Sequence, residues 1–391
     1  MTDTPYSGPG VLLRIGELFL KRGNRHIFFQ ALLANVQRAL KGRDDIRISH
    51  AMGRIYIEGA SDEDLLRRLR WVFGLTSISP GIFCDPDIDV ITPIAVDLAR
   101  TYPGGPETRF RVAARRADKT FPLNSGQIGA HVGGQIHLAT GFRVDLEQPD
   151  LSVGVEVGLK RTFIWARQLP GGGGLPVGTA GKVALLLSGG LDSPVAGHML
   201  QKRGVELTGI YFHAAPYTSD GAKEKVIALA RILAARQRRF QLLVVPFAPV
   251  QEALRDIVDP TWLVLLYRRA MVRIAEIIAR DEGISCLATG ESVGQVASQT
   301  LANIATVEDA ASLLVLRPVI AMDKAEIIRI ARDIDTYETS ILPHDDCCTL
   351  FTPRHPQTRG RADLAQRYEA RLPHLDQLLQ TAAEAAERIL L

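Results

Sequence analysis

Residues 183–204 read VALLLSGGLDSPVAGHMLQKRG, and the rest of the chain is organised around them. The apolar run 183–187 has the length and composition of a strand buried on both faces of a parallel sheet. After the small residues that follow, Ser193 is a suitable N-cap and Pro194 suits the first position of a helix. Gly204 is a natural residue just past the helix end. The stretch therefore predicts a strand, a glycine-rich turn and a helix, in that order.

The turn itself, SGGLDS at 188–193, predicts a binding site for an anion. Unpaired backbone N–H groups and the positive end of the helix dipole meet at a helix N-terminus. The turn matches neither GxGxxG nor GxxxxGK[ST], because no lysine follows the glycines. It resembles instead the pyrophosphate-binding loop of the PP-loop ATPases, which cleave ATP between the α and β phosphates and adenylate an oxygen of a substrate. The alternative is a serine and glycine turn without a ligand.

The whole chain has the length and composition of a globular protein of two or three domains, with 391 residues and a net charge of +3. No apolar run approaches the ~18 residues of a membrane span, and MTDTPYSGPG lacks the features of a signal peptide. We therefore expect no membrane contact and a cytoplasmic location. The spacing of the cysteines predicts neither a protein-built metal site nor a disulfide framework. These residues are Cys84, Cys286, Cys347 and Cys348.

Strands and helices alternate along the chain in two different ways. The first 75 residues predict a small α+β domain of ferredoxin-like type (1–75). From residue 182 onward, strands alternate with helices, which indicates an α/β domain with a doubly wound parallel sheet (182–391) and ligands at the carboxyl ends of its strands. Between the halves, LPGGGGLPVGTAG at 169–181 is predicted to be a linker, because glycine and proline of this density disfavour helix and strand.

The intervening segment, 76–168, carries two basic clusters on strand ends, with Phe121 and Trp165 nearby. Such clusters predict a surface that follows the phosphates of RNA. A charged, solvated edge strand is the alternative. The stretches RVAARRADKTFPLNS and GLKRTFIW resemble the THUMP domain of RNA-modifying enzymes, which implies an RNA-binding domain over 76–168. The candidate RNA-binding residues are Arg109, Arg111, Arg115, Arg116, Lys119, Lys160 and Arg161.

Other strand ends of the second half supply candidates for the same site as the glycine-rich turn. Tyr211 and Phe212 could flank an adenine, although both also suit an ordinary core. Arg268 lies in an apolar helix and needs a partner, for which an ATP phosphate would serve as well as a carboxylate. In TGESVGQVASQTLAN, Gly290 permits close approach and Gln299 presents an amide.

Two adjacent cysteines, Cys347 and Cys348, stand in HDDCCTLFTPRHPQT. Adjacent cysteines do not readily close an unstrained disulfide with each other, which favours a thiolate used as nucleophile or sulfur carrier. Neighbouring acidic and basic residues act oppositely on the thiol pKa, so the sequence leaves their reactivity open. Two buried structural cysteines are the alternative.

Five segments together resemble the tRNA 4-thiouridine synthetases, the tRNA sulfurtransferases also associated with making the thiazole of thiamine. They are RIGELFLKRGNR, LLLSGGLDSPVAG, TGESVGQVASQTLAN, LRPVIAMDKAEII and SILPHDDCCTLFTPRHP. The resemblance implies a sulfur carrier at Cys347 or Cys348, with a slight preference for Cys348, which borders the TLFTP turn. It implies an ATP site formed by Leu186, Leu187, Ser188, Gly189, Gly190, Asp192, Ser193, Tyr211, Phe212, Arg268, Gly290 and Gln299.

The resemblance further implies the reaction and the partners. ATP would adenylate a uridine of tRNA, a cysteine persulfide would then give 4-thiouridine at position 8, and Asp192 would help to hold Mg²⁺ on the phosphates. Some members carry a rhodanese domain with a second cysteine. None follows here, so we expect a cysteine desulfurase as the persulfide donor. A thiamine sulfur-carrier protein and a homodimer are implied as well. The alternatives are another PP-loop thio- or amidotransferase and an RNA-binding module with a degenerate ATPase fold.

Overall fold

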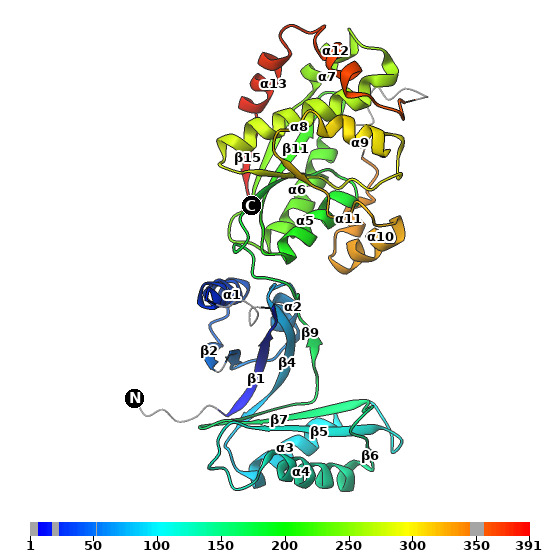
Figure 1. Ribbon diagram of the computed structural model, residues 1–391. Coiled ribbons are helices and arrows are strands. Elements are labelled where there is room, and N and C mark those ends of the chain that lie inside the picture. Colours follow the sequence, from blue (N-terminus) through cyan, green and yellow to red (C-terminus); the bar gives the residue numbers. More distant parts are fainter. Residues whose placement is uncertain (1–6, 18–22, 52, 345–355) are drawn as a thin grey trace. The chain divides into compact units, whose positions relative to one another are not determined.

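The computed structural model describes residues 7–17, 23–51, 53–344 and 356–391. The chain divides into two compact units, Met1–Leu175 and Pro176–Leu391, here called unit 1 and unit 2 (Figure 1). None of the helices in the described ranges is long and apolar enough to cross a membrane.

Unit 1 is built on a nine-stranded sheet in the order β2-β3-β1-β4-β8-β7-β5-β6, with β9 paired to β4. Helices α1 and α2 cover one part of this sheet, and α3 and α4 cover the part formed by β5 and β7. The elements are β1 (Gly8–Ile15), α1 (Arg25–Ala39), β2 (Arg47–Ala51), β3 (Arg54–Glu58), α2 (Glu63–Arg70), β4 (Leu75–Cys84), α3 (Ile88–Arg100), β5 (Arg109–Arg116), α4 (Ser125–Thr140), β6 (Arg143–Val144), β7 (Leu151–Val157), β8 (Thr162–Trp165) and β9 (Leu169–Pro170).

The long strand β4 connects the two parts of unit 1. It pairs with β1 along most of its length and with β8 at its end, through Ile82, Phe83 and Cys84. The predicted segments 1–75 and 76–168 therefore contribute to the same sheet. The predicted linker 169–181 starts with β9, whose Leu169 lies opposite Ile78 of β4.

Unit 2 contains the doubly wound parallel sheet that the sequence predicts. Its strand order is β14-β13-β10-β11-β12-β15, and all neighbours are parallel except β12 and β15. The elements are β10 (Lys182–Leu186), α5 (Asp192–Lys202), β11 (Glu206–His213), α6 (Asp220–Ala234), β12 (Gln241–Pro246), α7 (Ala248–Arg255), η2 (Pro260–Trp262), α8 (Leu263–Asp281), β13 (Cys286–Ala288), η3 (Ala297–Gln299), α9 (Leu301–Glu308), β14 (Leu314–Leu316), α10 (Lys324–Asp333), α11 (Tyr337–Ser340), α12 (Ala362–Glu369), α13 (Leu375–Glu384) and β15 (Glu387–Leu390).

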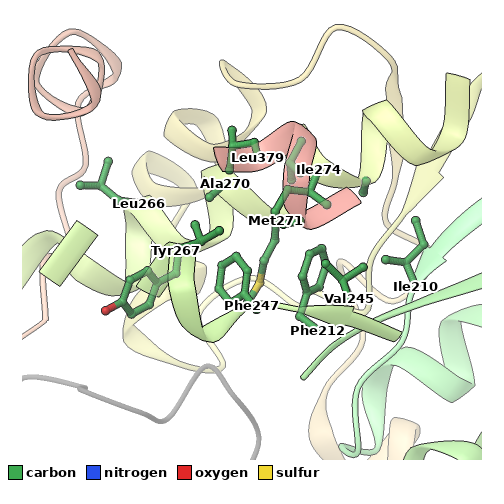
Figure 2. Packing of buried hydrophobic residues seen from close by; sticks show 14 of the residues in the cluster. Ile210, Phe212, Val245, Phe247, Leu266, Tyr267, Ala270, Met271, Ile274 and Leu379 are labelled. Atoms are coloured by element: carbon green, nitrogen blue, oxygen red, sulfur yellow. The ribbon is translucent and has the colours of Figure 1, made fainter. Parts of the chain in front are cut away.

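Helices pack on both faces of this sheet. Helices α5 and α6, with α10 and α11 against them, lie on one face, and α8 with α7, α9, α12 and α13 lies on the other. Figure 2 shows the core beneath α8, where Phe212 and Phe247 pack with Met271. The side chain of Tyr211 belongs to the core on the opposite face, because successive residues of a strand alternate.

Candidate functional site

A cavity of about 260 Å³ lies at the carboxyl ends of β10, β11 and β13. Strand β10 is the place where the strand order reverses, with β11 on one side and β13 on the other, and such switch points are where open α/β sheets bind ligands. The cavity is lined by Leu186, Leu187, Ser188, Gly190, Asp192, Ser193, Tyr211, Phe212, Arg268, Met271, Val272, Thr289, Gly290, Glu291, Gln299 and Val307.

The structure thus brings together the residues that the sequence places in an ATP site. All of them line this one cavity except Gly189, which lies in the same turn between Ser188 and Gly190. Sequence reasoning did not single out the apolar wall that Met271, Val272 and Val307 contribute. These residues are apolar and lie in helices that pack into the core, so the sequence does not mark them as binding residues.

The turn after β10 is fixed by its own serines. Helix α5 begins at Asp192 with Leu191 as N-cap, so the expectation that Ser193 caps the helix is wrong. The Ser193 hydroxyl instead turns back and accepts a hydrogen bond of 2.9 Å from the backbone N–H of Ser188. On the other side, the Ser340 hydroxyl of α11 donates to the carbonyl of Gly190 at 3.2 Å. The N–H groups of Asp192 and Ser193 belong to the first turn of α5, where the helix supplies no backbone acceptor for them.

Gly290, just after β13, packs directly against the start of α5. A Cβ added at this residue would lie 2.5 Å from the backbone nitrogen of Ser193 and 2.7 Å from the carbonyl carbon of Asp192. Only glycine therefore lets the loop after β13 approach the turn of residues 188–193 so closely, as the sequence predicts.

The buried carboxylate of Glu291 forms an ion pair with Arg268. Its oxygens accept from Arg268 at 2.6 Å, from Arg317 at 2.8 Å and from the Thr289 hydroxyl at 3.0 Å. Two buried polar atoms of the lining, Arg268 Nε and Gln299 Oε1, have no hydrogen-bond partner within the described residues. The cavity thus offers a ligand one cationic donor and one amide acceptor.

Asp192 lies at the entrance to helix α5 and is held by two side chains. Lys324 Nζ lies 2.8 Å from Asp192 Oδ1, and Gln295 Nε2 lies 2.9 Å from Oδ2. Sequence reasoning missed Lys324, although it lies in the quoted segment LRPVIAMDKAEII. In the sequence, Lys324 reads as the first residue of a helix, because Asp323 before it forms the capping box that starts α10.

Among the residues with a described position, no three acidic, histidine or cysteine groups gather into a metal site. Mg²⁺ commonly uses only one or two carboxylates besides the phosphates of a nucleotide and water, and Asp192 is a carboxylate that lines the cavity.

Cys347 and Cys348 lie outside the described residues, but the chain on both sides of them is attached near the cavity. Before them, the Ser340 hydroxyl donates to the carbonyl of the cavity residue Gly190 at 3.2 Å. After them, Asn303 Nδ2 donates to the carbonyl of Gln357 at 2.7 Å, and the Thr300 hydroxyl donates to that of Thr358 at 2.8 Å. Thr300 directly follows the cavity residue Gln299.

The two other cysteines are poor nucleophiles. Burial raises the pKa of the Cys84 thiol to about 12, with a further contribution from Asp85, and burial also raises the pKa of Cys286. Neither thiol forms a disulfide. Because thiolates rather than thiols react, neither is suited to sulfur transfer near neutral pH.

The candidate RNA-binding residues lie in unit 1 and differ in whether their side chains are bonded to other residues of the protein. Arg109 is ion-paired with Asp150 at 2.8 Å, and Arg111 donates to the Ser152 hydroxyl at 2.7 Å. Arg116 turns back onto the carbonyls of Phe121 and Leu123, and Arg161 pairs with the buried Glu58. The exposed members of the set are Arg111, Arg115, Lys119 and Lys160.

A strand, a PP-loop turn and a helix at the switch point of a doubly wound sheet define a nucleotide-binding protein of the PP-loop class. Residues 178–373 match the family model "Thiamine biosynthesis protein (ThiI)". Residues 10–79 match the ThiI ferredoxin-like domain, and residues 86–165 match the THUMP domain. The chain belongs to the ThiI family.

Individual relatives agree with this assignment. The chain is 46% identical to a probable tRNA sulfurtransferase of Brevibacillus brevis over 92% of this chain and 90% of the relative. It is 40% identical to one from Halothermothrix orenii, over 96% and 97%. Among solved structures, it is similar to a 4-thiouridine synthetase in complex with RNA and bound ATP. That match has a TM-score of 0.90 and 33% identity, and covers 98% of this chain and all of the other.

Proposed function

We propose that this protein is an ATP-dependent tRNA sulfurtransferase that makes 4-thiouridine at position 8. The observation that carries the proposal is the attachment of the chain on both sides of Cys347 and Cys348 to elements of the PP-loop cavity. The printed names of its relatives and the ATP and RNA in the similar structure support it.

The first step would activate the uridine. Its O4 attacks the α-phosphorus of ATP, a P–O bond forms, and pyrophosphate leaves toward the turn of residues 188–193. The N–H groups at the start of α5 favour the charge on that leaving group. Lys324, held 2.8 Å from Asp192, adds a cation beside the same turn. Mg²⁺, when bound with ATP, would neutralise phosphate charge, and Asp192 is the carboxylate placed to contact it.

The second step would deliver sulfur. The terminal sulfur of a persulfide on Cys347 or Cys348 bonds to C4 of the uridine, and AMP departs with the former O4. An external thiol then attacks the carrier sulfur, which breaks the S–S bond. The electron pair stays on the transferred sulfur as the 4-thio group, and the carrier cysteine is left in a mixed disulfide with the external thiol, which a second external thiol reduces. A cysteine desulfurase would supply the persulfide.

Unit 1 would bind the tRNA, since its THUMP domain carries the exposed Arg111, Arg115, Lys119 and Lys160. Phosphate contacts by such side chains make binding strongly dependent on salt. The description of the family as a thiamine biosynthesis protein favours sulfur transfer to a carrier protein as a second activity of the same cysteines. A homodimer remains part of the proposal.

The test is a reaction of purified protein with ATP, a persulfide donor and unmodified tRNA, followed by digestion and assay of 4-thiouridine. We expect one AMP and one pyrophosphate per thionucleoside. If tRNA binds but no thionucleoside forms, the protein is an RNA-binding module and the proposed enzyme activity is wrong.

Single Cys347→Ser and Cys348→Ser variants identify the carrier, and Cys286→Ser is the matched control outside the segment. One of the two should lose sulfur transfer while still releasing pyrophosphate. Full sulfur transfer by both would contradict the proposed route.

A further inference from the structure

The side chain of Asn303, in helix α9, is buried and bonded at both ends of its amide. It is 1% exposed. Its Nδ2 donates to the carbonyl of Ala297 at 2.9 Å and to that of Gln357 at 2.7 Å, and its Oδ1 accepts from the backbone N–H of Gly360 at 2.8 Å. All three partners lie outside α9. Because both amide hydrogens and the amide oxygen are engaged, these partners fix the direction in which the amide faces.

These bonds join two parts of the chain that the proposed reaction needs together. On one side they reach the first residue of η3, whose last residue, Gln299, lines the cavity. On the other side they reach residues 357–360, here called the return segment, which brings the chain back from Cys347 and Cys348. Asn303 therefore bonds directly to the element that forms the cavity wall and to the chain that follows the candidate sulfur carriers.

The return segment fits closely against α9. Residues 357–360 lie outside helices and strands, so other groups must satisfy their backbone polar atoms. The Thr300 hydroxyl donates to the carbonyl of Thr358 at 2.8 Å, in addition to the bonds from Asn303. A Cβ added at Gly360 would lie 2.7 Å from Asn303 Oδ1, a distance that real Cβ contacts do not reach. The return segment is thus held in one close-fitting position.

The proposed reaction has a competing step that such a fixed position can suppress. Once AMP is bonded to the uridine O4, water as well as the persulfide can attack C4. Water attack breaks the bond between C4 and O4, AMP leaves with the former O4, and the uridine is restored with the oxygen of the water. One ATP is then consumed without sulfur transfer. Sulfur competes well only from a correct position, because a misplacement of about 1 Å can cost about 100-fold in rate.

We propose that Asn303 is a positioning residue for sulfur delivery. It holds the return segment against η3, so the chain that carries Cys347 and Cys348 is anchored to the wall of the ATP site. Adenylation and sulfur transfer thereby stay coupled. The inference rests on the proposed function, because it concerns how often an adenylated uridine receives sulfur.

The test measures 4-thiouridine and pyrophosphate in the same reaction, with the full chain, saturating ATP, a persulfide donor and unmodified tRNA. The wild type should form about one thionucleoside per pyrophosphate. Asn303→Ala should still release pyrophosphate, but its ratio of 4-thiouridine to pyrophosphate should fall by about tenfold or more. A variant that is merely less stable loses both products together, which leaves the ratio unchanged.

Gly360→Ala disturbs the same contact from the other side and leaves α9 unaltered. Its Cβ would push the return segment away from Asn303, so its ratio should fall as well. Thr306→Val is the matched control in α9. Thr306 is 2% exposed, and its hydroxyl donates to the carbonyl of Ala302 within the helix at 2.8 Å. This variant loses a buried hydrogen bond of α9 but keeps those of the return segment, so its ratio should equal that of the wild type.

An unchanged ratio in Asn303→Ala overturns the inference, and Gly360→Ala decides the question if the first variant does not fold. An equal fall in Thr306→Val also overturns it, because any damage to α9 would then suffice. So does a complete loss of pyrophosphate release in both variants, which would assign Asn303 to ATP binding alone. If the wild type forms no 4-thiouridine, the proposed function is wrong. If the wild type thiolates tRNA and the variants keep its ratio, this inference alone is wrong.

Discussion

Asp192, in the turn after β10, forms an ion pair with Lys324, which lies 132 residues later in the chain. The pair is partly exposed, with 44% of the Lys324 side chain accessible, so it contributes little to folding. In the proposed mechanism, the position of Lys324 beside the turn of residues 188–193 makes it a charge available to the leaving pyrophosphate. We therefore assign the pair to the proposed chemistry of the site rather than to its stability.

We expect Lys324→Met to lower the rate of pyrophosphate release with ATP and tRNA by about 100-fold or more, the usual effect of removing one charge-stabilising group. The melting temperature should hardly change. Lys223→Met is the matched control, because Lys223 also forms an ion pair, but its partner Glu387 does not line the cavity, whereas Asp192 does. Equal rates for the two variants would remove Lys324 from the mechanism.

His198 makes a different prediction, one for stability against pH. Burial, together with the nearby Arg236 and Lys202, lowers the pKa of His198 to about 3, and Arg236 donates to its Nδ1 at 2.9 Å. The unfolded chain binds a proton here below its pKa of about 6.5 and the folded chain does not. Stability is therefore lost as pH falls below 6.5, by about 1.4 kcal/mol per pH unit from this residue.

Denaturant unfolding at pH 7 and pH 5 tests this prediction. His198→Gln should lose less stability between these pH values than the wild type does. His374→Gln, at the N-cap of α13, is the comparison and should keep the wild-type slope. Identical slopes in wild type and His198→Gln would show that His198 is not responsible.

At the scale of elements, the position of α5 depends on the glycine that meets its first turn. Gly290→Ala places a Cβ 2.5 Å from the Ser193 nitrogen, and the backbone there cannot move away as a flexible side chain would. We expect the turn of residues 188–193 to shift, with ATP affinity reduced by about tenfold or more, the scale of overpacking a tight contact. Isothermal titration calorimetry measures the ATP affinity of the variant and the wild type.

Gly134→Ala is the control for the glycine prediction. Gly134 lies inside α4, and an added Cβ would meet nothing within 4 Å. Alanine should stabilise that helix by up to about 1 kcal/mol and leave ATP affinity unchanged. Unaltered ATP affinity in Gly290→Ala would show that the turn tolerates displacement.

The sequence predicted those elements whose signal is local. The apolar run before SGGLDS identified β10, and the small residues after β13 identified the close approach at Gly290. Lys324 and Glu291 were missed because their roles arise from the order of the strands, which places α10 and the β13 loop beside β10. The expected cap at Ser193 failed because the hydroxyl bonds to Ser188 instead. Strand β15 was missed because four residues, ERIL, carry too little pattern.

At the scale of the whole molecule, two compact units with separate cores predict two thermal transitions. ATP should raise only the transition of unit 2, by the equivalent of about 2.7 kcal/mol at 100 times its Kd, and single-stranded RNA should raise that of unit 1. Differential scanning calorimetry with each ligand separates these effects. A single transition that both ligands raise would contradict independent units.

The strand β4 limits how relatives of this protein can be recombined. The ferredoxin-like and THUMP matches end at 79 and begin at 86, so a crossover chosen from them falls within or next to β4, which runs over Leu75–Cys84. In a chimaera joined there, one strand would have to pair with neighbouring strands from two parents. At Gly81 an added Cβ would lie 2.1 Å from the Ile164 carbonyl oxygen, so even alanine would not fit. Exchange of modules should therefore succeed at the boundary after Leu175, and the nine-stranded sheet should be inherited whole.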